Sequence, residues 1–287
     1  MNTNLISSGR GKEPEDGVLY LVGTPIGNLS DISPRAINVL KKVNFIACED
    51  TRNTRKIMTK YKFKNILESF NKINILKKTP KIIDCLKSGQ SIAIVSDAGM
   101  PCICDPGEEI VLNAKKNNIN VICIPGPCAA LTALVTSGFN SSKFVFEGFL
   151  PRKNNEREKI LREINQRDIT TVLYESPHRL KKLLEELKEH CGSTREISIS
   201  RELTKIFEQN YANNISHINE SFKNQIPKGE FTIVIKGNLE KKRNNNQEYL
   251  KAEISELIEA GLSLSRAIKY LAKKKNLSKN LIYNLYK

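Results

Sequence analysis

The feature that most constrains the fold is residues 19–29, an apolar strand-like run that breaks into the loop Gly23-Thr24-Pro25-Ile26-Gly27. Two glycines and a proline within five residues predict a tight turn where backbone can approach a ligand closely. A helix is expected to start at Pro34, after Ser33. Loops between a strand and a helix are common ligand sites in α/β proteins. The segment matches neither the dinucleotide-binding nor the nucleoside-triphosphate glycine pattern, so we expect a different ligand.

Strand and helix patterns alternate from Val18 to about Gly138. This alternation predicts a mostly parallel sheet that is covered by helices. The expected strands are 18–22, 43–48, 91–95 and 121–124. The expected helices are 34–42, 51–60, 73–87, 106–116 and 129–137.

A second block of strands and helices follows, which completes a prediction of two α/β domains at 18–138 and 139–238. Its expected strands are 144–146, 171–174, 196–200 and 231–235, and its expected helices are 156–166 and 177–191. Residues 1–17 are interpreted as a disordered lead-in. The polar stretch 239–247 is interpreted as a linker. Residues 248–287 carry three short helix patterns, and this small module either binds nucleic acid or packs to close the second domain.

The charge of the chain favours a polyanionic partner. The formal net charge is +15. Residues 52–87 contain 11 Lys or Arg but only two acids, and residues 264–287 contain seven Lys or Arg and no acid. Such clusters are suited to neutralising phosphates, whereas the alternative is a solvated basic face.

Several classes of protein are disfavoured. The seven cysteines are scattered, and Cys102 and Cys104 form the one close pair, without a second Cys or His pair at a zinc-like spacing, so we expect no metal site. Reduced cysteines fit a cytoplasmic protein. No run of 18 apolar residues is present, which predicts no membrane span, and the polar N-terminus is unlike a signal peptide.

Further strand ends run into loops rich in Gly, Pro and acidic residues. Gly and Pro at successive strand ends predict a cleft that is lined by backbone N–H and C=O groups. Each loop alone also fits ordinary turn chemistry. The loops are 49–52 (EDTR), 96–101 (SDAGMP) with 105–107 (DPG), 125–130 (PGPCAA) and 175–179 (ESPHR).

In these loops the chain resembles the ribosomal RNA small subunit methyltransferase I family, within the tetrapyrrole methylase superfamily. The resemblance covers residues 18–237 and is carried by nine motifs in order. These are 23–29 (GTPIGNL), 49–52 (EDTR), 96–99 (SDAG), 105–107 (DPG), 125–130 (PGPCAA), 147–151 (EGFLP), 174–176 (YES), 178–179 (HR) and 201–205 (RELTK). Met100, Cys102 and Cys104 depart from the pattern of that family.

The resemblance implies two α/β domains of the tetrapyrrole methylase type with S-adenosylmethionine in the cleft between them. It also implies 2′-O-methylation of a cytidine ribose in 16S rRNA near the ribosomal P site, a 16S rRNA or small-subunit partner, and a homodimer. The expected cofactor-binding residues are Thr24, Pro25, Asp97, Ala98, Gly99, Ile103, Gly126, Pro127, Cys128, Ala129, Ala130, Glu230, Phe231 and Thr232.

Asp50, Glu175 and Lys205 are the expected catalytic residues, because a weakly nucleophilic ribose hydroxyl must lose its proton near a carboxylate or a stabilising cation. Each has a structural alternative. Asp50 can cap the helix that begins at Thr51, Glu175 can pin the following turn, and Lys205 can pair with neighbouring glutamates. The expected RNA-binding residues are Arg52, Arg55, Lys56 and Arg201.

Two other functions remain open at this stage. A methyltransferase acting on a tetrapyrrole would need a larger apolar pocket, and the chain contains no Trp. A non-catalytic rRNA-binding assembly factor would keep the basic faces without needing complete cofactor loops.

Overall fold

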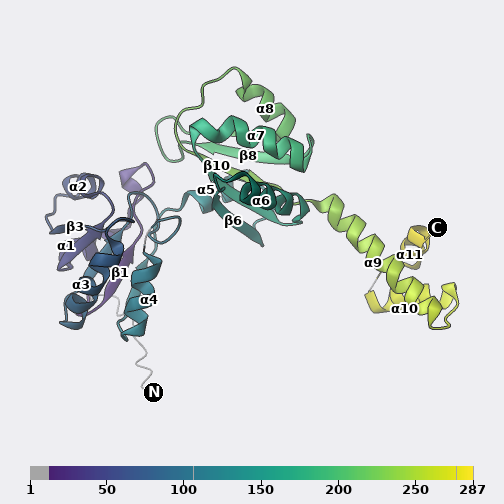
Figure 1. The fold of residues 1–287 in the computed structure, drawn as a ribbon, viewed down its shortest axis with the longest axis horizontal. Helices are drawn as coiled ribbons and strands as arrows, with labels where there is room; N and C mark the ends of the chain where they lie inside the picture. The colour runs from purple at the N-terminus through teal and green to yellow at the C-terminus, as the bar shows by residue number, and fades with distance from the viewer. Residues whose placement is uncertain (1–12, 106, 276, 287) are drawn as a thin grey trace.

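The computed structural model describes residues 13–105, 107–275 and 277–286, without the side chains of 240–246, 285 and 286. The described chain contains two five-stranded sheets and a separate group of C-terminal helices (Figure 1). This confirms the predicted fold class of two α/β sheets with helices. None of the described helices is long and apolar enough to cross a membrane.

The first sheet is entirely parallel and has the order β3-β2-β4-β1-β5. Its inner strands, β2, β4 and β1, are apolar on both faces, as expected of a parallel sheet that is covered by helices on each side. The strands are β1 (Leu19–Val22), β2 (Phe45–Cys48), β3 (Leu67–Ser69), β4 (Ile92–Val95) and β5 (Val121–Ile124). The helices are α1 (Pro34–Lys42), α2 (Thr51–Lys60), α3 (Ile75–Lys87) and α4 (Glu108–Lys116), with a 3₁₀ turn at Leu29–Asp31.

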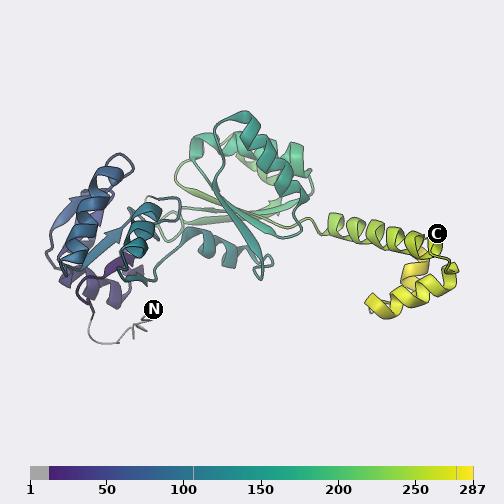
Figure 2. The same cartoon turned by 60° about the horizontal axis from the view of Figure 1, so that its bottom comes forward.

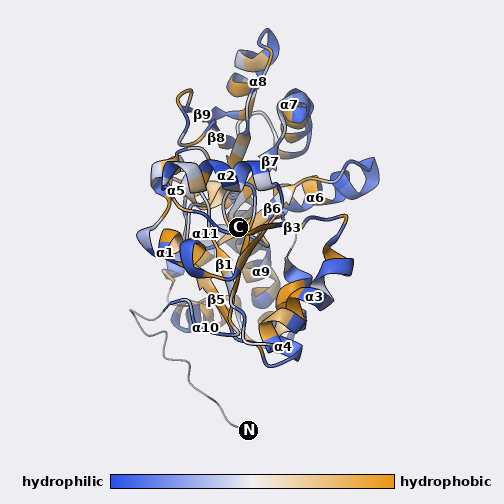
Figure 3. Cartoon of the chain, turned by 90° about the vertical axis from the view of Figure 1, so that its left-hand side faces the viewer, coloured by the Kyte–Doolittle hydropathy of each residue, from blue (hydrophilic) through white to orange (hydrophobic). Residues whose placement is uncertain are grey.

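Alternating side chains of the inner strands enter two different cores. Tyr20 and Ile46 pack with α1 on one face, whereas Leu19 and Ile92 pack with α3 and α4 on the other. In Figure 3 β1 is coloured as hydrophobic, whereas α2 is mostly hydrophilic. The inner strands are therefore buried on both sides, and α2 presents a polar surface to solvent.

The second sheet is mixed and has the order β6-β7-β10-β8-β9. Strands β6 and β7 are parallel, and the remaining pairs are antiparallel. The strands are β6 (Phe144–Phe149), β7 (Thr170–Glu175), β8 (Glu196–Arg201), β9 (Gln209–Asn214) and β10 (Phe231–Ile235). The helices α6 (Asn154–Gln166), α7 (Pro177–Cys191) and α8 (Ile215–Lys223) cover one face through a single apolar core.

Helix α5 (Ala129–Ser137) follows the last strand of the first sheet but packs on the second sheet (Figure 1). Its buried residues Ala133 and Leu134 share an apolar cluster with Val172 of β7 and Val234 of β10. The predicted first domain, 18–138, includes this helix. Its apolar face is instead satisfied by the second sheet, so the chain crosses between the two sheets at about residue 128.

The C-terminal helices are α9 (Leu239–Glu259), α10 (Leu264–Lys275) and α11 (Lys279–Tyr286). They share a core of their own, to which Ile254, Ile268 and Ile282 contribute. Figure 2 shows α9 leading away from the second sheet, with α10 and α11 folded back at its far end. Residues 239–247, which are predicted as a linker, are helical and form the first turns of α9.

Other differences concern polar or very short elements. Strands β3 and β9 and helix α8 were not predicted, and β9 has the polar sequence QNYANN. Residues 1–12 of the expected disordered lead-in lie outside the description. Within the remainder, Glu13 pairs with Arg35, and the Glu15 amide donates a 2.8 Å hydrogen bond to the Tyr20 hydroxyl, so residues 13–17 are held against the first sheet.

Candidate functional site

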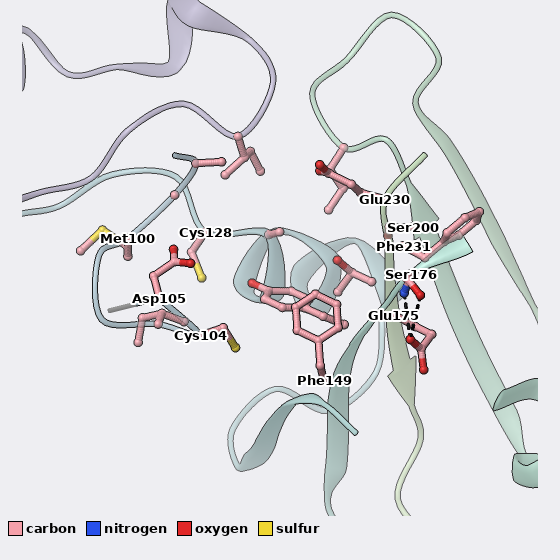
Figure 4. Close-up of a pocket in the computed structure, with 18 of the residues that line it drawn as sticks. Met100, Cys104, Asp105, Cys128, Phe149, Glu175, Ser176, Ser200, Glu230 and Phe231 are labelled. Carbon is pink, nitrogen blue, oxygen red and sulfur yellow. Dashed lines mark hydrogen bonds between the residues drawn. The ribbon is translucent and has the colours of Figure 1, made fainter. Parts of the chain in front are cut away.

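A cavity of about 320 Å³ lies where loops of the first sheet meet strand ends of the second (Figure 4). This size suits a single small-molecule ligand. From the first sheet come the loops after β1, β4 and β5, and from the second come β6, β7, β8 and β10 with their adjoining residues. The lining residues are Ile26, Ala98, Gly99, Met100, Ile103, Cys104, Asp105, Cys128, Ala129, Phe149, Tyr174, Glu175, Ser176, Pro177, Ser200, Leu203, Glu230, Phe231 and Thr232.

The loops after β1 and β4 are fastened together at the edge of the cavity. Thr24 and Gly99 exchange two backbone hydrogen bonds of 2.8 and 3.1 Å. The Thr24 hydroxyl is buried and donates toward the carbonyls of Ser96 and Gly99, at 3.2 and 3.3 Å. Gly99 has φ +81°, a backbone conformation that side chains disfavour. Thr24 therefore shapes the wall through Gly99, without itself lining the cavity.

Two glycines at the ends of β1 and β5 explain why these loops lie so close together. A Cβ built on Gly126 would lie 2.7 Å from the Cα of Gly23, and one built on Gly23 would lie 2.6 Å from the Cα of Gly126. Neither backbone has room for a side chain. Gly126 is thus a packing position behind the site, and a bulky residue there would disturb the fold as well as any ligand.

The second sheet supplies an aromatic wall. Tyr174 of β7 packs edge-on against Phe146 and also contacts Phe149, with ring centroids 5.0 and 5.6 Å apart. Its hydroxyl accepts a 3.1 Å hydrogen bond from the backbone N–H of Ala130 at the start of α5. Burial raises the pKa of Tyr174, which keeps the phenol neutral. Tyr174 therefore fixes the beginning of α5 against the cavity.

Glu175 lies at the end of β7 with its side chain buried. Its Oε1 accepts a 2.9 Å hydrogen bond from the Ser176 amide, which holds the turn into α7. Two arginines flank it: Arg157 Nη2 lies 3.5 Å from Oε2, and Arg179 Nε lies 3.5 Å from Oε1. Arg157 is itself buried and forms a shorter, 2.7 Å pair with Glu186. The position of Glu175 is therefore compatible with both interpretations from the sequence, a residue of the site and a residue that holds the following turn.

Polar groups in the cavity have capacity left for a ligand. The Ser200 hydroxyl is buried and has no hydrogen-bond partner among the described residues, so it is free to contact a polar ligand atom. Burial raises the pKa of Asp105, although a hydrogen bond from Ser96 opposes the shift. Figure 4 shows Asp105 beside Cys104 and Cys128, opposite Ser200 and Phe231. A small, partly apolar molecule with hydroxyl, amine or carboxylate groups fits these surroundings.

Asp50 lies outside the cavity lining, at the start of α2. Its carboxylate accepts a 2.8 Å hydrogen bond from the Arg52 amide and pairs with the Arg52 side chain at 2.5 Å. These hydrogen bonds lower the pKa of Asp50 to about 2. The Asp50 amide donates a 2.9 Å hydrogen bond to Asp97, which joins the loops after β2 and β4. The helix-cap interpretation of Asp50 is therefore met by the geometry, and Asp97 ties loops together on the exposed side.

Lys205 also lies outside the lining but bridges its edge. Its Nζ donates hydrogen bonds to Glu202 and Glu230, at 2.8 and 3.1 Å. Burial opposes its charge, but the two hydrogen bonds outweigh burial and raise the pKa of Lys205. The aliphatic part of Lys205 lies over Gly27, and the Asn28 amide donates a 3.1 Å hydrogen bond to Thr204. The loop after β8 thus closes onto the loop after β1.

The expected RNA-binding residues fall into two environments. Arg52, Arg55 and Lys56 are exposed on α2, and Arg52 is held by Asp50. Arg201 is half-buried, and it donates hydrogen bonds to the Lys228 carbonyl and to a side-chain oxygen of the neighbouring β9. Arg55 and Lys56 are thus the more available cations.

Nine predicted site residues line the cavity: Ala98, Gly99, Ile103, Cys128, Ala129, Glu175, Glu230, Phe231 and Thr232. Thr24, Pro25, Asp97, Gly126, Pro127 and Ala130 support the surrounding loops without lining it. Phe149, Tyr174 and Ser200 also line the cavity but were not among the predicted site residues. Tyr174 and Ser200 fall at the ends of predicted strands, and Phe149 falls in the segment that was expected to join the two domains. The serines in the pattern of β8, ISISR, were the one available signal of a polar inward face. Among the described residues, no group of three or more His, Cys, Asp or Glu is arranged to hold a metal ion.

Comparison with known proteins places this geometry in a family. A family model described as Tetrapyrrole (Corrin/Porphyrin) Methylases matches residues 18–219. The chain belongs to this family. One relative, ribosomal RNA small subunit methyltransferase I of Synechocystis sp., is 41% identical over 270 residues, which are 94% of this chain and 97% of the relative. Another of the same name, from Thermotoga maritima, is 43% identical over 221 residues, which are 77% of this chain and 99% of the relative.

The predicted membership of the ribosomal RNA small subunit methyltransferase I family is therefore confirmed. The tetrapyrrole methylases are S-adenosylmethionine-dependent methyltransferases, which agrees with the predicted cofactor. Solved structures confirm the fold. A cobalt precorrin-4 methyltransferase gives a TM-score of 0.58 at 14% identity, covering 77% of this chain and 95% of that one. A uroporphyrin-III C-methyltransferase from Thermus thermophilus, complexed with S-adenosylhomocysteine, gives 0.55 at 14%, covering 75% and 96%.

Proposed function

We propose that this protein uses S-adenosylmethionine to methylate the 2′-hydroxyl of a cytidine ribose in 16S rRNA, in the P-site region of the small ribosomal subunit. The observation that carries the proposal is the cavity between the two sheets, in a chain whose relatives are named as rRNA methyltransferases. The position on the sugar and the nucleotide come from the resemblance of the nine motifs to that family.

The cavity residues provide what the cofactor needs. Ile26, Ile103 and Leu203 offer apolar contact, and the buried Ser200 hydroxyl offers a hydrogen bond. The turn at Gly99 brings backbone to the wall without an intervening side chain. When bound, S-adenosylmethionine supplies an activated methyl group, so the protein chiefly aligns the acceptor and excludes water.

The acceptor hydroxyl has to lose a proton, and the carboxylates near the cavity differ in their ability to take it. Asp50, with its pKa of about 2, is a weak base and is held by Arg52. Glu175 is enclosed by two arginines. Asp105 lines the cavity and has a raised pKa, which brings it closer to the range that suits a general base. We therefore assign proton acceptance to Asp105, which sequence reasoning had not selected.

The other predicted catalytic residues then have supporting roles in this proposal. Glu175 holds the turn at Ser176, which lines the cavity. Lys205 keeps its positive charge and orients Glu230 at the cavity edge through a hydrogen bond. It also places a cation where an incoming phosphate or a developing oxyanion would be stabilised.

The size of the cavity bears on the type of acceptor. About 320 Å³ is near the lower end of the range for one drug-sized ligand, so the cavity suits the cofactor alone better than the cofactor together with a tetrapyrrole. A ribose presented at the surface of a large RNA needs only to reach the opening. The exposed cations Arg55 and Lys56 on α2 favour such an RNA substrate over a tetrapyrrole.

The experiment that tests the proposal is methyl transfer from labelled S-adenosylmethionine to small subunits lacking the modification, followed by nucleoside analysis. Labelled 2′-O-methylcytidine would support the substrate, the reaction and the position on the sugar together. Label on a base would refute the assignment to the ribose. Cofactor binding without transfer to RNA would refute the rRNA assignment and direct the search to small-molecule acceptors.

The proposal carries two further expectations from the family resemblance, a homodimer and a cytoplasmic location. Sedimentation of the purified chain tests the first, and fractionation of cells tests the second. A monomer at working concentrations would refute the dimer without affecting the assigned reaction.

A further inference from the structure

The outer surface of the C-terminal helices carries a concentrated positive charge. Arg266, Lys269, Tyr270 and Lys273 are all exposed on α10. Their spacing of three and four residues places them on one side of the helix, and Lys279 at the start of α11 is also exposed. We call these five residues the C-terminal basic face. The opposite side of α10 is buried in the core of the module, through Ala267, Ile268, Leu271 and Ala272.

The cations of this face lack acidic partners. Within the described part of the chain, no ion pair involves Arg266, Lys269, Lys273 or Lys279, whereas Lys274 and Lys275 on the flank of α10 pair with Glu253 at 3.4 and 3.1 Å. Residues 264–287 contain no Asp or Glu. Like charges three or four residues apart on a helix destabilise it slightly. A polyanionic partner would neutralise this repulsion and bind to the same cations.

Aromatic rings accompany the cations. Tyr270 is 51% exposed in the middle of the stripe, and Tyr283 of α11 is 45% exposed. Exposed aromatic rings between basic residues are the arrangement on which unpaired RNA bases stack while the cations contact phosphates. Unpaired RNA offers phosphates for the cations and planar bases for the rings on the same molecule, so we take RNA as the partner.

The module stands apart from the cofactor cavity. It has its own core, and the 21-residue helix α9 places it at the end of a rod about 30 Å long (Figures 1 and 2). The Thermotoga maritima relative matches over almost its whole length but leaves about a quarter of this chain without a counterpart, which is enough for α9–α11. A relative named as a ribosomal RNA small subunit methyltransferase I is therefore too short to match both sheets and the C-terminal module of this chain together.

We propose that the C-terminal basic face is a second RNA-binding surface, which holds an unpaired segment of rRNA away from the methylated ribose. This inference rests on the proposed function, because it assumes an rRNA substrate. It answers the question that the sequence left open, since a module with its own core does not act by closing the second domain. Its contribution is to substrate affinity and not to the transfer step.

The test compares two triple variants of the full-length protein. One is Arg266→Gln/Lys269→Gln/Lys273→Gln, which neutralises the C-terminal basic face. The control is Lys42→Gln/Lys115→Gln/Lys116→Gln, which removes the same charge from exposed ends of α1 and α4. Binding to purified 16S rRNA is measured between 50 and 200 mM salt, and circular dichroism checks that both variants are folded.

The expected result is a lower salt dependence in the first variant alone. Loss of three phosphate contacts reduces the slope of log affinity against log salt by about 2–3. The difference in affinity between the wild type and this variant should therefore be about 30-fold smaller at 200 mM salt than at 50 mM salt. In methyl transfer to small subunits, KM should rise and kcat at saturating substrate should remain unchanged. Tyr270→Leu should weaken binding to rRNA without altering the slope, because stacking carries no charge.

Equal salt slopes in the two triple variants would overturn the inference. The outcome is separate from that of the proposed function, because RNA binding is measured without transfer. A wild-type protein that binds rRNA through this face but transfers no methyl group would refute the proposed reaction and leave the RNA-binding surface standing.

Discussion

Arg157→Met should destabilise the second sheet more than any exposed charge change on the same helix. The Arg157 side chain is 3% exposed and lies between the carboxylates of Glu175 and Glu186, at 3.5 and 2.7 Å. Removing one partner from a buried ion pair costs about 3–5 kcal/mol, because a buried charge is left uncompensated. Glu175 retains Arg179 and the Ser176 amide, so we expect the lower end, about 3 kcal/mol.

The assay is urea unfolding followed by circular dichroism. With a denaturant slope of about 2 kcal/mol/M, a loss of 3 kcal/mol lowers the midpoint by about 1.5 M. The matched control is Arg162→Met, because Arg162 lies on the same helix, is 68% exposed and pairs with Glu158 at 3.0 Å. An exposed pair of this kind contributes less than about 1 kcal/mol.

A double-mutant cycle separates the ion pair from simple packing. Glu175→Gln alone should cost less than Arg157→Met, because Arg157 keeps its closer partner Glu186. In the Arg157→Met background the same change should be nearly neutral or stabilising, since it removes the uncompensated charge. A loss below about 1 kcal/mol for Arg157→Met, or additivity within about 0.5 kcal/mol, would refute this reasoning.

Three further predictions concern the cavity and α2. Gly126→Ala should cost about 1–3 kcal/mol and weaken cofactor binding, since its Cβ would meet Gly23; calorimetry showing both unchanged would contradict the packing. Burial raises the pKa of Asp105, so its ionisation costs stability as pH rises above the unfolded value of 3.8. Asp105→Asn should therefore raise Tm at pH 7 but not at pH 3, and it should slow methyl transfer. An equal change in Tm at both pH values would show that ionisation of Asp105 does not cause the change. Arg55→Gln/Lys56→Gln should lower the salt slope for RNA by about 1.5, whereas an unchanged slope would return these residues to a solvated face.

The sequence predicts well those elements whose side chains carry a periodic apolar signal. Strands β1, β4 and β5 are continuous apolar runs, and α2, α5 and α7 begin at the predicted residues. Strand β9 gave no such signal, because it is a polar edge strand, and β3 is only three residues long. The packing of α5 on the second sheet was not predictable from its own sequence, because periodicity shows that a face is buried but not which surface buries it.

The same limit applies to the site. Loops after β4 and β5 were found because Gly and Pro mark a turn whatever the fold around it. Tyr174 and Ser200 were missed because each belongs to a strand whose inward side chains ordinarily form core. They line a cavity only because the second sheet faces the loops of the first. Asp50 illustrates the opposite case, since its local role as a helix cap, readable from sequence, is what the structure contains.

The structural neighbours share the fold of this chain but are named for different substrates, which suggests that separate parts of the fold bind the cofactor and select the substrate. Enzymes named for uroporphyrin-III and cobalt precorrin-4 have the same two-sheet frame at 14% identity, so the frame alone does not define a substrate. The surfaces of this chain that are suited to a large polyanion are positively charged and lie outside the cavity. Arg55 and Lys56 lie on α2, near the loops that surround the opening, and the C-terminal basic face lies at the end of α9. Substrate choice would then depend on surfaces that guide a large polyanion, while the cavity itself stays suited to the cofactor.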